Sequence, residues 1–219
     1  MKITSIEPQK KNSRRFNIFL DGQFAFGADE DLVVEHRLIP GKMLDLPLIN
    51  KLLLEAEVGK LIEKMYRWLG IRQRSEKEAR DYFRIKNLEF RIKGKDTISD
   101  LSVESVITAL KRKGILNDLE FARAWIDARS KKKGLRVIKQ ELFQKGISKE
   151  IVEQITDNEL QAKNEAEVVT RLILKKINSW KNLEPLKLKK KAYDFLLQRG
   201  FEYEVIREIV EKVIKREYN

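Results

Sequence analysis

Hydrophobic and polar residues change their period along the chain, and the first part is typical of β-strands. The stretch "RRFNIFLDGQFAFGA" carries β-favouring residues on both sides of Asp21-Gly22, a pair that suits a two-residue type I′ turn. The pattern predicts a hairpin in which Phe19 lies opposite Phe24 and Ile18 lies opposite Ala25. Both faces would then carry apolar side chains, so at least one face should pack on another element.

Two short elements are expected beside this hairpin. Residues 2–6 can add a third strand, and "DEDLVVEHRL" predicts a short helix whose acidic residues suit its positive N-terminal end. The phrase "IPGKMLDLP" then predicts a turn before a long helical region.

From Leu48 onward the pattern is helical. Val58, Leu61, Ile62, Met65 and Leu69 form one apolar stripe at 3.6-residue spacing. Helix starts are indicated at Ser75, which forms a capping box with Glu78, at Ser102, and at Asn117-Asp118. The third of these begins a helix with an apolar face of Phe121, Ala124, Trp125 and Ala128. Later helices are predicted over residues 137–143, 148–155, 168–177, 185–197 and 205–214, which gives nine helices of about 10 to 18 residues.

One phrase occurs three times, as "LKRKGILNDLEFA", "LFQKGISKEIVEQI" and "LLQRGFEYEVIREI". Each has a basic residue before a glycine (Gly114, Gly146 or Gly200) and an apolar residue after it. A glycine just past a helix supplies the left-handed conformation, and the next apolar residue packs back on the helix. Each phrase therefore predicts a corner between two helices.

Grouping the helices in threes explains the unequal spacing of these glycines. We expect an N-terminal β-segment with a short helix over residues 1–48, and three-helix repeats over residues 49–115, 116–160 and 161–219. Because short helices are marginal alone, neighbouring repeats should bury one another's faces. The predicted fold is mainly α, with tandem three-helix repeats in an elongated, curved array and a small N-terminal β-hairpin or meander.

Charge changes the picture more than overall composition does. The net charge is +12, and residues 1–50 are balanced with seven basic and seven acidic residues, so the whole excess lies after them. Such an excess favours a polyanionic partner, either nucleic acid or a nucleoprotein; a basic surface that only aids solubility is the alternative. The chain has no cysteine, no run long enough to span a membrane and no apolar segment typical of a signal peptide. We expect a soluble cytoplasmic protein.

Catalytic or metal-binding chemistry is not indicated. His36 is the single histidine and has no partner at metal-ligand spacing, so a packing or surface role is expected. The "PGKM" stretch lacks the first glycine and the Ser or Thr of a phosphate-binding loop. Acidic pairs such as Glu208 and Glu211 have the spacing of any solvated helix. We expect no catalytic residues, no metal and no cofactor.

Two basic tracts stand out, at residues 129–145 and 171–191. Stacked repeats would place them at related positions on one surface, where they could follow phosphates or an acidic groove. Two solvated helix faces would give the same pattern, and Trp125 and Trp180 beside them are expected in the core. The candidate contact residues are Arg129, Lys131, Lys132, Lys133, Arg136, Lys139, Arg171, Lys175, Lys176, Lys187, Lys189, Lys190 and Lys191, and the tracts also contain Lys145 and Lys181.

The repeated glycine phrases and the N-terminal β-segment resemble those of the RecX family in its longer form. Members of this family are bacterial regulators of the RecA recombinase. The resemblance rests on Gly114, Ile115, Asp118, Phe121 and Ala122, followed by Glu141-Leu142, Lys145-Gly146-Ile147 and Arg199-Gly200-Phe201, and it covers nearly the whole chain. One departure is "KNLEFRIKGKDTIS", which is longer than the expected tight corner of the first repeat.

The resemblance implies a non-enzymatic regulator that binds the RecA nucleoprotein filament and inhibits or remodels it, with effects on recombination, DNA repair and the SOS response. We expect weak, sequence-independent contact with single- and double-stranded DNA, no membrane contact and a monomer. A helix-turn-helix-like DNA-binding regulator and a basic helical-repeat scaffold remain as alternatives.

Overall fold

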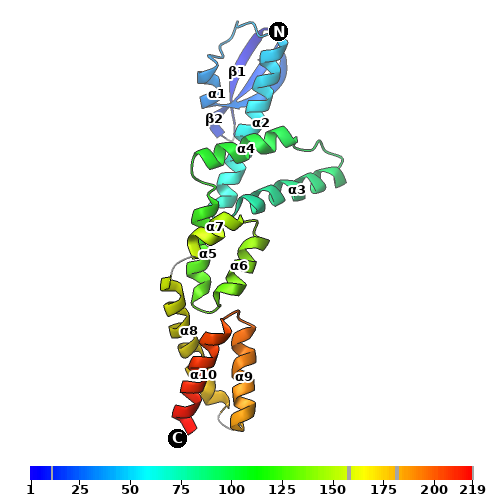
Figure 1. The fold of residues 1–219 in the computed structure, drawn as a ribbon. Coiled ribbons are helices and arrows are strands. Elements are labelled where there is room, and N and C mark those ends of the chain that lie inside the picture. Colours follow the sequence, from blue (N-terminus) through cyan, green and yellow to red (C-terminus); the bar gives the residue numbers. More distant parts are fainter. Residues whose placement is uncertain (11, 157–158, 181–182, 219) are drawn as a thin grey trace. The chain divides into compact units, whose positions relative to one another are not determined.

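The computed structural model describes residues 1–10, 12–156, 159–180 and 183–218 (Figure 1). Within these residues the chain is mainly helical and carries one small antiparallel sheet near its N-terminus, as the sequence predicts. The strands are β1 (Ile3–Gln9), β2 (Asn12–Leu20) and β3 (Gln23–Asp29). The helices are α1 (Glu30–Glu35), α2 (Leu46–Leu69), α3 (Glu76–Ile92), α4 (Asp100–Arg112), α5 (Asp118–Ser130), α6 (Leu135–Gln144), α7 (Lys149–Thr156), α8 (Glu159–Ile177), α9 (Pro185–Leu197) and α10 (Tyr203–Tyr218), with a 3-10 turn η1 (Asn178–Trp180).

The chain divides into two compact units. The first comprises residues 1–73 and 79–116, and the second comprises residues 74–78 and 117–219. Buried hydrophobic residues form two core clusters in each unit. The repeat boundaries and the elongated, curved shape expected from the sequence stay predictions.

The N-terminal sheet has the order β1-β2-β3, and its predicted turn is confirmed, because Asp21 and Gly22 both have positive φ angles of 44° and 85°. Phe19 lies opposite Phe24 as predicted, but the pairing of Ile18 with Ala25 is wrong. A bulge in the ladder pairs Ile18 with Phe26 instead. The extra residue turns both Ile18 and Phe26 into the core.

Helix α2 contributes to both cores of the first unit. Its first half, with Ile49, Leu52 and Ala56, packs with α1 and one face of the sheet. Its second half, with Leu61 and Met65, packs with α3 and α4, so the predicted apolar stripe is a core face. This helix has 24 residues, which is longer than the predicted 10 to 18. Helix α7 has eight residues, the length of the predicted segment 148–155.

Helix α4 begins earlier than the sequence analysis predicts. Its N-cap is Ser99, whose side chain accepts a hydrogen bond from the Ser102 N–H, while Ser102 itself is buried and donates from its hydroxyl to Glu57 (2.5 Å). Ser102 suits a cap equally well by residue type, and only burial decides against it. The long connection before Ser99 is closed by Asn87, which donates to the Ile98 carbonyl and accepts from the Ile98 N–H, each at 2.9 Å.

The second unit contains α5 to α7 around one cluster and α8 to α10 around another. Figure 1 shows α10 running between α8 and α9. In α5 the buried residues are Phe121 and Ala122, whereas Ala124 and Ala128, predicted on the apolar face, are exposed. Trp125 stacks on Phe121 at 5.6 Å between ring centroids, and Trp180 meets Phe195 at 5.5 Å, so both rings take part in packing.

The three predicted glycine corners are confirmed. Gly114, Gly146 and Gly200 have φ angles of 68°, 80° and 80°. After Gly146 the N–H of Ile147 donates to the Leu142 carbonyl (3.0 Å), and Ile147 is buried, which is the hydrogen-bond pattern of a Schellman cap. At Gly114 the following Ile115 is 44% exposed, and Leu116 packs back in its place.

Candidate functional site

The two predicted basic tracts both lie in the second unit. The first tract covers the end of α5 and all of α6, and the second covers the end of α8, η1 and the start of α9. Lys181 lies outside the residues that the structure describes. The other candidate side chains divide into cations that have a partner among the described residues and cations that have none there.

Glu141 engages much of the first tract. Its carboxylate accepts hydrogen bonds from Lys133 Nζ and from Trp125 Nε1 (2.9 Å), and Arg129 Nε lies 3.6 Å away. The Arg129 guanidinium also stacks over the Trp125 ring at 4.6 Å. Partial burial alone raises the pKa of Glu141, but the bonds from Lys133 and Trp125 outweigh it and hold the pKa below its usual range. Lys133 and Arg129 therefore already have a counter-ion.

Other predicted contact residues are also engaged. Arg136 donates to the Leu197 carbonyl at 3.0 Å, and Arg171 donates to the Lys131 carbonyl at 2.9 Å. Lys189 pairs with Glu211 at 3.0 Å, and Lys187 pairs with Glu184 at 3.1 Å on the exposed surface. Lys176 lies over the Phe195 ring and Lys191 over the Trp180 ring, at 6.0 and 5.5 Å.

Five of the predicted contact residues have no side-chain ion pair or hydrogen bond within the part of the chain that the structure describes. We call them the open lysines: Lys131, Lys132, Lys139, Lys175 and Lys190. An amine with no internal partner is available to a phosphate or a carboxylate of another molecule at no loss of internal contacts.

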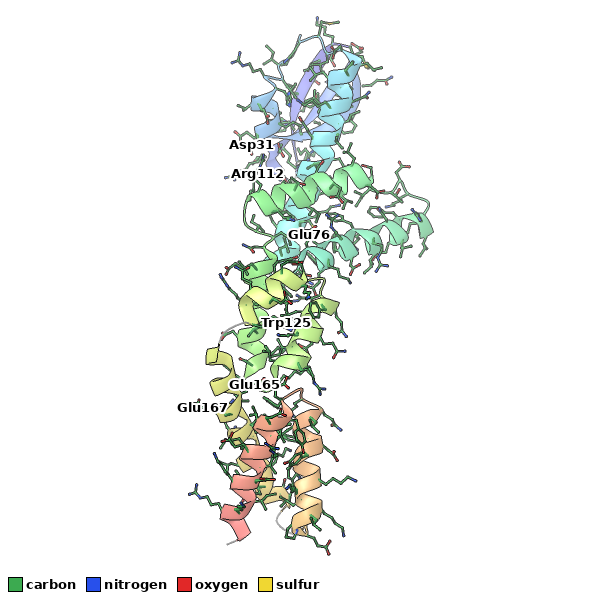
Figure 2. The ribbon with its side chains drawn as sticks, in the orientation of Figure 1. Asp31, Glu76, Arg112, Trp125, Glu165 and Glu167 are labelled. Carbon is green, nitrogen blue, oxygen red and sulfur yellow. The ribbon has the colours of Figure 1, made fainter. Side chains whose placement is uncertain are left out.

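The ends of the two tracts meet between α5 and α8. A hollow of ≈ 400 Å³ is lined by Lys131 and Lys133 of the first tract and by Arg171 of the second. Arg171 also lines an adjoining hollow of ≈ 710 Å³ that Lys175 shares. Carboxylates of Asp127, Glu165 and Glu167 lie in the first hollow as well, so its charge is mixed. Figure 2 labels Glu165 and Glu167 on α8.

The repeated corners have a second role that the sequence analysis missed. The start of α3 packs on the corner after α6, where the Ser75 hydroxyl donates to the Lys145 carbonyl (2.7 Å) and Lys145 Nζ reaches Glu78 (2.6 Å). Likewise, the start of α6 packs on the corner after α9, where the Gly134 N–H donates to the Arg199 carbonyl (2.9 Å). We call each contact between the start of a helix and such a corner a joint. The first joint is at Gly146 and the second is at Gly200. In both joints the acceptor is the carbonyl of the basic residue that precedes the glycine.

Space at these joints explains the glycines. A Cβ on Gly146 would lie 2.5 Å from Lys77 Cβ, and a Cβ on Gly200 would lie 2.5 Å from Val137 Cγ2. A Cβ on Gly134 would overlap the Gly200 carbonyl and the Phe201 nitrogen. Gly114 has nothing within 4 Å of the same position, so it is a corner without a joint.

Glu165 completes the second joint. Its Oε1 accepts from the Leu135 N–H at 2.6 Å, and the backbone N–H of Glu202 also bonds to its carboxylate. Burial raises the pKa of Glu165, and the nearby charge of Glu202 acts in the same direction. No sequence signal marks this residue, because its partners lie 30 or more positions away.

Replacing Glu165 by alanine is expected to cost about 1–3 kcal/mol, because two backbone N–H groups lose their acceptor. A raised pKa means that the folded state binds the proton more tightly, so its contribution is greatest below the unfolded pKa near 4.5 and is lost as pH rises through the folded pKa. The stability gap between the parent and Glu165→Ala should therefore widen as pH falls from 7 toward 4.5.

Thermal melts of both proteins across this pH range test the prediction. Glu167→Ala, which removes an exposed carboxylate from the same helix, is the control and should show no such widening. A gap that is constant with pH, or that narrows on acidification, would contradict the assigned direction of the Glu165 pKa.

Features of other functional classes are few in the described parts of the chain. His36 contacts Glu55 at 2.6 Å and serves packing between α2 and the segment after α1. No group of three metal-ligating side chains occurs among the described residues, and none of the described helices has the length and apolar character needed to cross a membrane.

Comparisons with known proteins agree on one family. The model described as "Regulatory protein RecX N-terminal domain" matches residues 1–45, "RecX, second three-helix domain" matches residues 117–155, and "RecX, third three-helix domain" matches residues 164–210. The regulatory protein RecX of Clostridium perfringens (strain 13 / Type A) is 32% identical over 219 residues, covering 99% of this chain and 98% of that protein. The RecX of Listeria monocytogenes serotype 4b (strain CLIP80459) is 32% identical over 210 residues, covering 94% of this chain and 73% of that protein.

Solved structures lead to the same fold. A crystal structure of regulatory protein RecX is similar with a TM-score of 0.75 and 26% identity, covering 96% of this chain and 98% of that one. The crystal structure of RecX from Lactobacillus salivarius is similar with a TM-score of 0.60 and 24% identity, covering 72% of this chain and 96% of that one. At this identity the similarity shows the fold alone. With relatives aligned over nearly its full length and three family models matched in order, the chain belongs to the RecX family of regulatory proteins.

Proposed function

We propose that this protein binds the RecA nucleoprotein filament and inhibits or remodels it without catalysing a reaction. Family membership supports RecA as the partner. The observation that carries the proposal is the meeting of the two basic tracts between α5 and α8, where Lys131, Arg171 and Lys175 line adjoining hollows. A surface of this kind can contact DNA phosphates and acidic protein groups together.

The mechanism we propose is competition. The second unit contacts the filament through the open lysines, and its bound presence hinders strand exchange, repressor cleavage or the addition of RecA subunits, with consequences for recombination, repair and the SOS response. Contact with bare single- or double-stranded DNA is weak and independent of sequence. The protein acts as a monomer in the cytoplasm.

One binding experiment tests the proposal. Affinity is measured at a single salt concentration for bare duplex, bare single strand and single strand coated with RecA, since salt changes phosphate contacts strongly. The coated strand is expected to bind most tightly, and the bare DNAs weakly and equally across sequences. Tight, sequence-dependent binding to duplex would favour a helix-turn-helix regulator instead, and no preference for the coated strand would overturn the proposal.

The acidic starts of two helices argue against reading of bases. Glu150 lies in the first turn of α7 and Glu204 in the first turn of α10, the positions from which a recognition helix would meet DNA. A carboxylate there repels the phosphates on either side of the groove. This repulsion favours the filament proposal over sequence-specific binding.

A further inference from the structure

Helix α3 carries an apolar stripe that its own unit does not cover. Ile85, Leu88 and Ile92 are 53%, 52% and 86% exposed. They follow one another at spacings of three and four residues, so they share one face of the helix. We call these three residues the α3 stripe.

The opposite side of α3 is firmly held, so the stripe is not the surface of a frayed helix. Ala79 and Phe83 are buried in the core formed with α2 and α4. Asn87, between the stripe residues in sequence, makes the two hydrogen bonds to Ile98 that close the connection to α4. Figure 1 shows the far end of α3 extending away from α2. The orientation of the helix is thus fixed by residues that leave the stripe free.

Positive charge surrounds the stripe. Arg91, Lys93 and Lys95 near its end are exposed, and no ion pair of their side chains occurs within the described residues. Glu89, the single acidic residue within residues 84–95, is already bonded to Lys86 at 2.8 Å. An apolar line flanked by exposed cations complements a surface that offers apolar anchors among carboxylates.

We infer that the α3 stripe docks an acidic amphipathic helix of a protein partner. The inference rests on the proposed function in one respect, because it makes the stripe the contact for RecA protein and leaves the open lysines for phosphates. Seven residues of helix span about 10 Å, which matches the i, i+3 and i+7 anchors by which a helix is recognised. Phosphates offer no apolar surface to these side chains. Three side chains of this size are also too few to hold a chain on a lipid bilayer.

The test uses the full chain with Leu88→Gln and Ile92→Gln, changes that keep good helix formers at exposed positions. Binding is measured to two probes, namely RecA-coated poly-dT and a synthetic helical peptide with Leu at i, i+3 and i+7 flanked by Glu, and to two reference ligands, bare poly-dT and vesicles of phosphatidylglycerol. Affinity for both probes is expected to fall tenfold or more, while affinity for bare poly-dT stays unchanged. Val34→Gln with Leu46→Gln, at positions 68% and 67% exposed, is the control and should leave the affinity for every ligand unchanged.

The outcomes separate the stripe from the proposed function. If the parent binds the peptide but not the coated strand, and the double variant loses the peptide, the function falls and the docking surface stands. Parent-like affinity of the double variant for both probes overturns the inference. So does a loss confined to vesicles of phosphatidylglycerol, which would assign the stripe to a lipid surface.

Discussion

Replacing Gly200 by alanine is expected to lower the free energy of unfolding by about 3–4 kcal/mol, whereas Gly114→Ala should cost about 1–2 kcal/mol. Both glycines have a left-handed backbone, with φ angles of 80° and 68°, and a side chain in that conformation costs roughly 1–2 kcal/mol. Only Gly200 also meets a neighbour, Val137, where an added methyl group must force the joint apart. Overpacking of this kind costs about 1–3 kcal/mol more.

Gly134→Ala measures the cost of overpacking without the cost of backbone strain. Its φ angle is −78°, which any residue adopts, so the expected loss of about 1–3 kcal/mol comes from overlap with the Gly200 backbone alone. Because Gly134 and Gly200 hold the same joint, the double variant should be less destabilised than the sum of the two single variants. Once the joint is open, the second methyl group has nothing left to displace.

Urea unfolding of the four variants measures these losses. Amide hydrogen exchange locates them, because the Gly134 and Phe201 N–H groups should lose protection in Gly134→Ala and keep it in Gly114→Ala. Equal losses for Gly114→Ala and Gly200→Ala would show that backbone strain is the whole effect. The joint would then contribute nothing to stability.

Local patterns in the sequence predict the helix corners. They do not predict the contacts between residues that are distant in the sequence. A glycine between a basic and an apolar residue predicts the left-handed cap at Gly146, since that conformation is decided within a few residues. The docking of Ser75 on Lys145 joins positions 70 apart in sequence. Only the three-dimensional arrangement of repeats brings them together, so a single sequence offers no periodic signal for it.

Smaller errors have the same origin. The hairpin turn at Asp21-Gly22 was predictable from two residues, but the bulge that moves Ile18 opposite Phe26 depends on which side chains the core accepts. Ser102 and Ser99 are alike as caps, and burial decides between them. The basic tracts could be predicted from the sequence because they are rich in lysine and arginine. Their division into engaged cations and open lysines depends on Glu141, whose three partners meet only in the fold.

Reversing three open lysines of the first tract, in Lys131→Glu, Lys132→Glu and Lys139→Glu, is expected to weaken binding to the RecA-coated strand on the order of 100-fold. Each phosphate contact on a single strand contributes about 0.7 to the log-log salt slope, which at 0.1 M salt is roughly fivefold in affinity. Loss of three contacts should also lower the slope by about 2. Stability should change little, about 0.5 kcal/mol, because these side chains have no internal partner among the described residues.

Two further variants show whether the loss of affinity comes from the open lysines themselves. Lys2→Glu, Lys10→Glu and Arg14→Glu change the net charge equally at exposed positions of the N-terminal segment, so they measure the effect of overall charge. Lys133→Glu places a carboxylate beside Glu141 and removes its bonded partner, so it should reduce stability more than affinity.

Salt titrations of binding to the coated strand, together with urea unfolding, separate these effects. A slope that stays at the parent value in the Lys131, Lys132 and Lys139 variant would mean that none of the three replaces a counter-ion on the filament. An equal loss of affinity in the N-terminal variant would mean that net charge alone draws the protein to its partner. Either result removes the open lysines from the interface, because a contact residue must change both the affinity and its dependence on salt.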